Sequence, residues 1–210
     1  NWFEEAQIRS EDVDHAFSNF IVRNNLFRES GAAVSGSISG FENTSNFVID
    51  HNLFYAGAST VRSVFATDCR FLIISNNIFV RRNALAENSF STFTNNITYL
   101  ASTFSEPWNG NSNIDGGGNI SETDPQMASQ SSVNSGVNDP LLDFTIASGP
   151  ANDSGTDGKD LGLLFDATGS LNWNISRSSR LPLITNMSIT TTSVTPGGNI
   201  SVTIGSKVNN

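Results

Sequence analysis

The sequence predicts an all-β chain organised as a parallel β-solenoid, followed by a short antiparallel β segment. One reason is an internal repeat whose aligned Asn residues are 24, 27, 25, 19 and 23 residues apart, at positions 1, 25, 52, 77, 96 and 119. Three short strands and three turns consume about twenty-odd residues, whereas helical repeats run longer. A second reason is composition, because only 15% of residues are charged and Phe numbers 15. That mix suits short strands and polar turns better than amphipathic helices.

Each repeat unit contains a short apolar run, an Asn corner, and then Leu or Ile followed in most units by Phe. The clearest copies are Phe20–Phe27, Phe47–Phe54 and Leu72–Phe79, and shorter matches occur at 91–98 and 116–121. Asn tolerates the left-handed backbone conformation that a tight corner requires, and stacked amides can bond from one coil to the next. We therefore expect a structural Asn ladder consisting of Asn25, Asn52, Asn77, Asn96 and Asn119.

The apolar columns of the repeat predict the interior of the solenoid. We expect two columns to point inward, Ile21/Val48/Ile73 and Leu26/Leu53/Ile78/Ile97. Phe27, Phe54 and Phe79 form an aromatic stack on one side of the wall or the other, since short runs do not settle the alternation. A third strand is expected at 33–38 and 61–65, and with its turns it is the expected place for a binding groove.

The Asn-Asn-x-Phe corners resemble those of the pectate-lyase-like superfamily of right-handed parallel β-helices. The block Asn138–Gly162, with Asn-Asp-Pro, Gly-Pro-Ala and Asp-Gly-Lys-Asp-Leu-Gly, is similar to the closing coils of bacterial surface β-helix proteins, especially those of Bacteroidetes. The resemblance implies a right-handed parallel β-helix of about six or seven coils over residues 1–166. The chain begins inside a repeat, so we expect this helix to be N-terminally truncated.

The remaining residues predict a different β module. Residues 167–181 are polar and read as a linker. Two alternating segments at 183–190 and 199–204, joined by a Pro-Gly-Gly turn at 196–198, predict antiparallel strands. We expect residues 182–210 to be the first strands of an incomplete immunoglobulin-like or fibronectin-like sandwich.

The resemblance implies a secreted or cell-surface protein that binds a polysaccharide, or binds and degrades it. The alternative is a non-catalytic structural rod, an adhesin or a secreted cargo passenger. A net charge of −9 argues against nucleic acid and anionic membrane partners, which are held by clustered Lys and Arg. The sequence contains no run of eighteen apolar residues, so we do not expect membrane insertion. The expected partners are extracellular polysaccharide or components of the cell surface or secretion machinery.

An enzyme of this superfamily would be a polysaccharide lyase or a glycoside hydrolase. Such enzymes need a cation with a base, or two or three close carboxylates, and the signature of neither group is present. The remaining catalytic candidates are the ionisable side chains Arg9, Glu11, His15, Arg62 and Arg70. The alternative for these residues is a solvated face with salt bridges. Convergence beside a cleft would favour a site, and scatter would favour the rod.

Three further features carry a functional and a structural interpretation. His51 takes the place of the first Asn in a corner and is a corner residue or a general base. Trp108 lies in a loop and either stacks on sugar or anchors that loop. Asp153, Asp157 and Asp160 offer oxygen ligands in a Gly-rich stretch, so Ca²⁺ could bind there, although Asp-Gly turns also explain them. No cofactor is required by the sequence.

Cys69 is the single cysteine of the chain. It cannot form an intrachain disulfide, and its apolar neighbours predict a packed thiol rather than a reactive one.

Overall fold

The computed structural model describes residues 1–10, 16–30, 36–57, 61–139 and 141–165, and the backbone of 183–189 and 202–207. The chain forms two compact units, Asn1–Phe165 and Asp166–Asn210. Among the described residues of the first unit, all strand pairs are parallel. Helix is limited there to α1 (Gln130–Asn134) and the 3-10 turns η1 (Ser102–Phe104) and η2 (Pro107–Asn109). The mainly β class with nearly no helix is confirmed, and the stacked parallel sheets are consistent with a β-solenoid.

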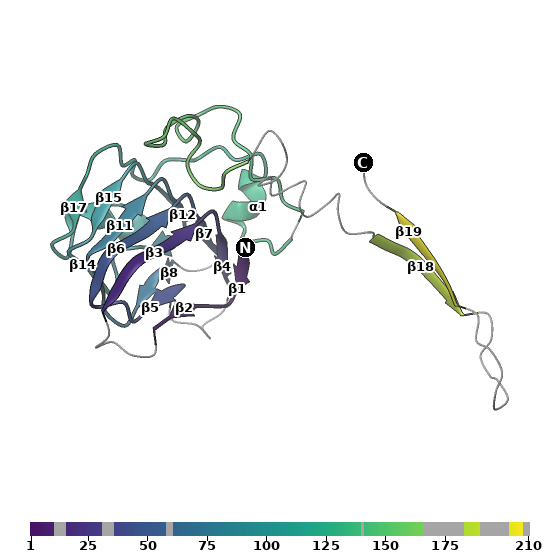
Figure 1. The fold of residues 1–210 in the computed structure, drawn as a ribbon. Coiled ribbons are helices and arrows are strands. Elements are labelled where there is room, and N and C mark those ends of the chain that lie inside the picture. The colour runs from purple at the N-terminus through teal and green to yellow at the C-terminus, as the bar shows by residue number, and fades with distance from the viewer. Residues whose placement is uncertain are drawn as a thin grey trace. The chain divides into compact units, whose positions relative to one another are not determined.

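Most of the described strand residues of the first unit belong to two five-stranded parallel sheets (Figure 1). Sheet 1 contains, in order, β1 (Trp2–Glu4), β4 (Leu26–Glu29), β7 (Leu53–Ala56), β12 (Ile78–Val80) and β16 (Ile97–Tyr99). Sheet 2 contains, in order, β3 (Phe17–Arg23), β6 (Thr44–Asp50), β11 (Leu72–Ser75), β15 (Thr92–Thr94) and β17 (Ile114–Asp115). The chain visits the two sheets alternately, so each repeat adds one strand to each sheet.

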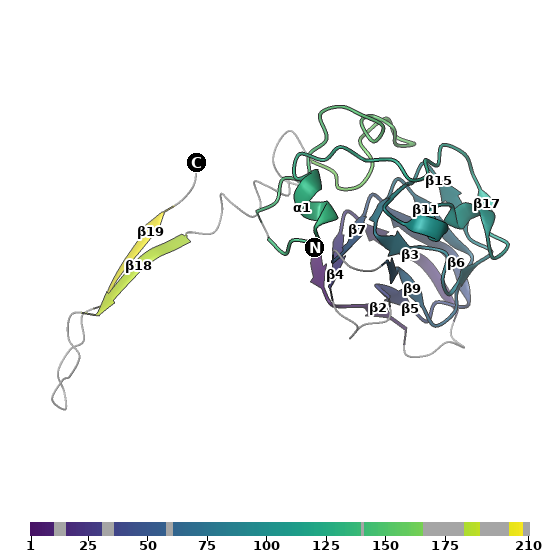
Figure 2. The ribbon, with the colours of Figure 1, turned by 180° about the vertical axis from the view of Figure 1, so that it is seen from behind.

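Short parallel pairs complete the repeats between the two large sheets. A three-stranded sheet contains β2 (Ile8–Arg9), β5 (Ile38–Ser39) and β9 (Phe65–Ala66), which Figure 2 shows close together. The other two pairs are β8 (Arg62–Ser63) with β13 (Arg82–Asn83), and β10 (Cys69–Arg70) with β14 (Asn88–Ser89). The expected third strand thus consists of two-residue pieces, and positions 33–35 of it lie outside the described residues.

The interior face of sheet 1 carries the aromatic stack. Phe3, Phe27, Phe54 and Phe79 stack in sequence, with ring centroids 4.7, 4.7 and 5.2 Å apart. Phe27, Phe54 and Phe79 belong to the hydrophobic core and Phe3 packs against it, which settles the side that the repeat pattern left open. Leu26, Leu53, Ile78 and Ile97 are also buried, but alternation along each strand puts them on the opposite face of sheet 1. The prediction that this column fills the interior is therefore wrong.

Sheet 2 has its interior column one residue away from the predicted one. Ile21 is 66% exposed and Ile73 is 42% exposed, so this column points outward. The buried column consists of Val22, Ile49, Ile74 and Phe93. The runs before the corners are apolar on both faces, so their composition did not distinguish the two registers, and a shift of one residue exchanges the faces.

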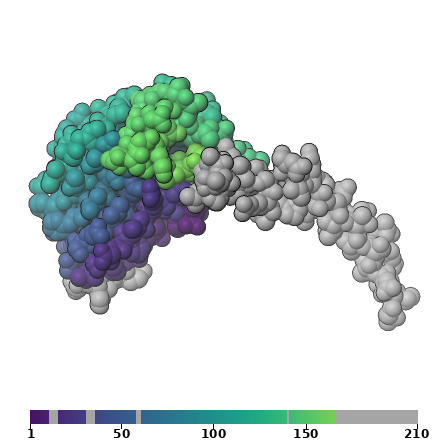
Figure 3. Space-filling view, turned by 45° about the horizontal axis from the view of Figure 1, so that its top comes forward, coloured from purple at the N-terminus to yellow at the C-terminus, as the bar shows by residue number. Residues whose placement is uncertain are grey.

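A covering segment, residues 127–139 and 141–165, packs on the outer face of sheet 1. Arg28 donates from Nε to the Gly136 carbonyl at 3.1 Å, and the Tyr55 hydroxyl donates to the Val137 carbonyl at 3.0 Å. Figure 3 shows the later part of this segment, in green, on the surface of the earlier repeats. The block expected to form closing coils contains no strand among its described residues. It shields sheet 1 instead of extending it.

A buried ion pair lies within the first unit. Arg82 Nη2 donates to Glu29 Oε1 at 3.1 Å, and the two side chains are 0% and 1% exposed. The same nitrogen also contacts Ser37 Oγ and the Ser63 carbonyl, each at 2.7 Å. Burial lowers the pKa of Arg82, and the nearby Glu29 carboxylate opposes that shift.

The Cys69 thiol is fully buried, with its sulfur 3.6 Å from the Ala66 carbonyl oxygen and 3.7 Å from that of Ile38. Burial raises its pKa to about 11. The expected packed thiol is confirmed, and the raised pKa disfavours the reactive thiolate.

The second unit contains one described antiparallel pair, β18 (Leu183–Ile189) with β19 (Val202–Lys207). The predicted turn at 196–198 lies outside the described residues. No helix in the described part of the chain is long and apolar enough to cross a membrane.

Candidate functional site

An Asn ladder runs along one corner of the repeats. The amide oxygen of Asn52 accepts from the Asn25 backbone N–H at 3.0 Å and from its side-chain amide at 3.2 Å. In the same way, the backbone N–H and the side-chain amide of one ladder residue donate to the amide oxygen of the next in the pairs Asn52–Asn77, Asn77–Asn96 and Asn96–Asn119. Asn1 adds a side-chain bond to Asn25 at 3.1 Å. The ladder therefore links the repeats through buried amides.

The residue before each ladder Asn forms a second column, on the outer side of the corner. This outer column consists of Asn24, His51, Asn76 and Asn95, all with positive φ. The covering segment binds three of its side chains through hydrogen bonds. Leu164 N–H donates to Asn24 Oδ1 at 2.9 Å, Thr156 N–H to Asn76 Oδ1 at 2.8 Å, and Asn95 Nδ2 to the Ser154 carbonyl at 2.7 Å.

His51 occupies the same column inside a cluster of charged groups. Its Nδ1 lies 2.9 Å from Asp50 Oδ2, and its Nε2 lies 3.4 Å from Asp157 Oδ1 of the covering segment. Arg23 Nε is 2.9 Å from Asp50 Oδ2, and Lys159 Nζ is 3.8 Å from Asp157. The imidazole is fully buried. It is placed to hold the covering segment, and it has no exposed face with which to reach a substrate.

The Asp50 carboxylate is the best-satisfied acid of this cluster. Burial opposes its ionisation, but hydrogen bonds from His51, Ser75 and Asn76 outweigh burial and hold the pKa of Asp50 below its ordinary value. Ser75 Oγ and Asn76 Nδ2 both donate to Oδ1 at 2.8 Å. Asp50 is therefore an anion that joins β6, β11 and the corner, and its oxygens are already occupied.

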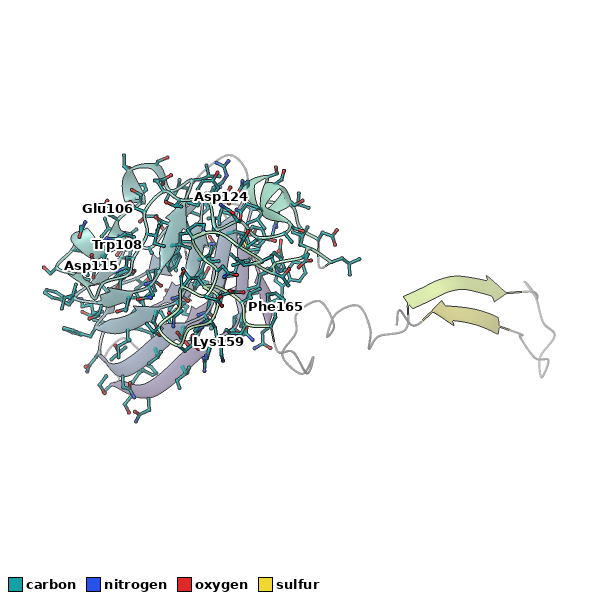
Figure 4. The ribbon with its side chains drawn as sticks, turned by 90° about the horizontal axis from the view of Figure 1, so that it is seen from above. Glu106, Trp108, Asp115, Asp124, Lys159 and Phe165 are labelled. Atoms are coloured by element: carbon teal, nitrogen blue, oxygen red, sulfur yellow. The ribbon has the colours of Figure 1, made fainter. Side chains whose placement is uncertain are left out.

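The three aspartates considered for Ca²⁺ lie on the covering segment but point to different partners. Asp157 faces His51, whereas Asp160 accepts from the Asp153 backbone N–H at 2.9 Å. Among the described residues, no group of three or more acidic, His or Cys side chains is arranged to hold a metal ion. A hollow of about 210 Å³ beside them is lined by Asp153, Gly158, Lys159, Asp160, Leu164 and Phe165. Figure 4 shows Lys159 and Phe165 near each other.

The arginines considered for catalysis lie on different sheets. Arg9 is on β2, Arg62 on β8 and Arg70 on β10. Arg70 forms ion pairs at 3.5 Å with both Glu42 and Asp68. Glu11 and His15 lie outside the described residues. The structure does not gather the described candidates on one sheet.

Trp108 is only 5% exposed and belongs to the hydrophobic core. Its ring packs edge-on against Phe93, with centroids 6.4 Å apart. Figure 4 shows it with Glu106 and Asp115, away from Lys159 and Phe165. Loop anchoring is the role that this placement fits.

Sequence reasoning missed an exposed apolar surface on sheet 2, which we call the outer wall. It has a strand column, Ile21, Val48, Ile73, Thr92 and Ile114, aligned by the strand register. Beside it lies what we call the turn column, four residues with positive φ: Asn19 and Asn46 within β3 and β6, and Phe71 and Phe90 just before β11 and β15. Phe71 and Phe90 are 53% and 48% exposed and stack at 5.6 Å. The available signal was Phe at positions where neighbouring repeats have Asn.

These features define the chain as a repeat protein of stacked parallel β-sheets. No protein-family model matches it. No similar protein was found among the curated proteins, and no similar fold was found among the solved structures.

Proposed function

We propose that this chain is an extracellular or cell-surface right-handed parallel β-helix that binds polysaccharide without cleaving it. The observation that carries the proposal is the exposed Phe71–Phe90 stack on the outer wall. Exposed aromatic faces suit the apolar faces of sugar rings, and two rings side by side offer a longer platform than one.

A binding role without cleavage is the better choice between the two carbohydrate functions. The described arginine candidates lie on separate sheets, and His51 is buried under the covering segment. The charged groups around His51 instead have a structural role, because each of them contacts another protein group. Neither Ca²⁺ nor another cofactor is needed for the proposed binding.

A second candidate is a rod, adhesin or cargo passenger without a carbohydrate ligand. It is favoured by the continuous Asn ladder and Phe stack, which couple successive repeats into one column. In either case we propose that residues 182–210 begin an immunoglobulin-like module. The proposed extracellular or cell-surface location rests on the resemblance to Bacteroidetes-type surface proteins.

The test is a glycan array read with calcium and with chelator, while ultraviolet absorbance detects unsaturated products. The test variant is Phe71→Asn/Phe90→Asn. It places at both positions the residue type that occupies positions 19 and 46 of the turn column, and Asn tolerates the left-handed backbone. The matched control is Phe104→Asn, a ring 37% exposed on η1.

We expect binding without products, reduced about tenfold or more in the double variant and retained in the control. Ultraviolet-absorbing products would establish a lyase. No binding to any glycan would favour the rod.

A further inference from the structure

The outer wall is long and narrow. Its strand column crosses five adjacent strands, which at about 4.8 Å per strand spacing makes it about 19 Å long. The turn column lies two residues away along each strand, so the wall is about two side chains wide. Its area is on the order of 200 to 300 Å², well below the roughly 800 Å² that each partner buries in a standard protein interface. A thin linear ligand fits this surface better than a folded protein or a second copy of the chain.

The charges around the wall disfavour an anionic ligand. Four acids, Glu42, Asp68, Glu87 and Asp115, lie within four residues of a wall residue in the sequence, and the nearby Arg70 guanidinium is paired with Glu42 and Asp68. Arg23, at the end of β3, is paired with Asp50. The whole chain has a net charge of −9 and only two lysines, Lys159 and Lys207. A polyuronate would therefore approach a surface of its own sign.

The turn column changes character along the wall. At one end Asn46 Nδ2 donates to Asn19 Oδ1 at 2.8 Å in an exposed pair, which presents further amide donors and acceptors to solvent. At the other end Phe71 and Phe90 present ring faces. Hydroxyl groups of a sugar suit the amides, and the C–H face of a sugar ring suits the aromatic rings.

We infer that the ligand of the outer wall is a neutral linear glycan that lies across the strands of sheet 2, from the Asn19–Asn46 pair to the Phe71–Phe90 stack. The inference rests on the proposed function and adds the chemical class, location and direction of the bound chain. It predicts that affinity rises with oligosaccharide length until the chain spans the wall, and that salt has little effect on binding.

The experiment compares β-1,4-linked glucose oligosaccharides and galacturonate oligosaccharides of equal length, using calorimetry at low and high salt. The proteins are the full chain, Phe71→Asn/Phe90→Asn, Ile73→Asp and the control Phe104→Asn. Ile73→Asp places a carboxylate in the middle of the strand column, where the side chain is already exposed. Thermal unfolding checks that each variant keeps the fold.

We expect the neutral oligosaccharide to bind with at least about tenfold loss in both wall variants and none in the control. Stronger binding of galacturonate, or neutral binding that the wall variants leave intact, overturns this inference while the proposed polysaccharide function stands. Failure of every glycan in the array overturns both. A concentration-dependent dimer abolished by Phe71→Asn/Phe90→Asn, seen by sedimentation, would identify a second copy as the occupant and also overturn it.

Discussion

At the scale of single residues, each corner has two adjacent positions with different duties. The inner position is Asn in every described repeat and bonds the next repeat. The outer position adopts positive φ and faces the covering segment. Asn suits both positions, because its amide both donates and accepts and because it tolerates the left-handed backbone. His51 keeps the backbone conformation and exchanges the amide contacts for contacts with two carboxylates.

Removing one ladder amide is expected to destabilise the protein. Asn77→Ala removes, in a buried setting, the acceptor of the Asn52 backbone N–H, one acceptor of the Asn52 side-chain amide and the donor to the Ile49 carbonyl. We expect a loss of about 2 to 4 kcal/mol in the free energy of unfolding, measured by urea denaturation. The exposed control Asn109→Ala should change stability by less than about 0.5 kcal/mol. Equal effects of the two substitutions would contradict a structural role for the ladder.

Asp50 predicts a pH dependence of stability. Its pKa is lower in the folded protein than in the unfolded chain, because hydrogen bonds from His51, Ser75 and Asn76 outweigh burial. Its contribution to the free energy of unfolding is therefore present above the pKa of the unfolded chain, about 4, and is lost as pH falls through the lower pKa of the folded protein. Asp50→Asn should be less stable than the parent at pH 7, and the difference should shrink under acid conditions. A difference independent of pH, measured by denaturant titration, would exclude this linkage.

At the scale of elements, the two large sheets differ in what covers their outer faces. Sheet 1 is buried on both faces, because Leu26, Leu53 and Ile78 are almost fully buried and Gly162 of the covering segment lies against the Ile78 side chain. The outer face of sheet 2 keeps Ile21, Ile73 and Ile114 exposed. Strands buried on both faces read as continuous apolar runs. Sheet 2 has similar runs without that cover, which is why its outer wall is a candidate binding surface.

The buried Arg82–Glu29 pair joins β13 to β4 and can be tested by a double-mutant cycle. Removal of either partner alone, as Arg82→Met or Glu29→Leu, leaves a buried charge and should cost about 3 to 5 kcal/mol. The double variant should recover a large part of that loss, since both charges are gone. Denaturation midpoints measure all four proteins. Additive losses would mean that the two side chains act independently.

At the scale of the whole molecule, the first unit contains its own core and its own cover. The Phe stack, the Asn ladder and the covering segment all lie within Asn1–Phe165. The described strands of the second unit pair only with each other. The candidate binding surface on sheet 2 also lies within the first unit.

A fragment of residues 1–165 is therefore expected to fold alone, with a thermal midpoint within about 2 °C of the same transition in the full chain. A shorter fragment, residues 1–125, lacks the covering segment and exposes the outer face of sheet 1. It should be markedly less stable or aggregate. Circular dichroism and light scattering distinguish the outcomes. An unfolded 1–165 fragment would show that the first unit needs the second.

Part of the fold could be read directly from the chain. The repeat spacing and the Asn corners predicted stacked parallel strands, because backbone conformation at a corner depends on the residue that occupies it. Which apolar column points inward was not predictable for sheet 2, since the apolar runs before its corners fit both registers and only packing selects one. The candidate site was predicted less well. The Phe71–Phe90 stack lies outside the aligned motif, and Trp108 turned out to be a buried loop anchor.

By itself, the sequence determined the repeat, the corner residues and the β class, because these follow from local conformational preference and periodicity. Only the tertiary structure decided that the covering segment packs on sheet 1, that His51 meets Asp157, and that the outer face of sheet 2 stays exposed. Those outcomes depend on contacts between residues far apart in the chain. Such contacts are selected by the free energy of packing and charge pairing in the folded state, which no local pattern records.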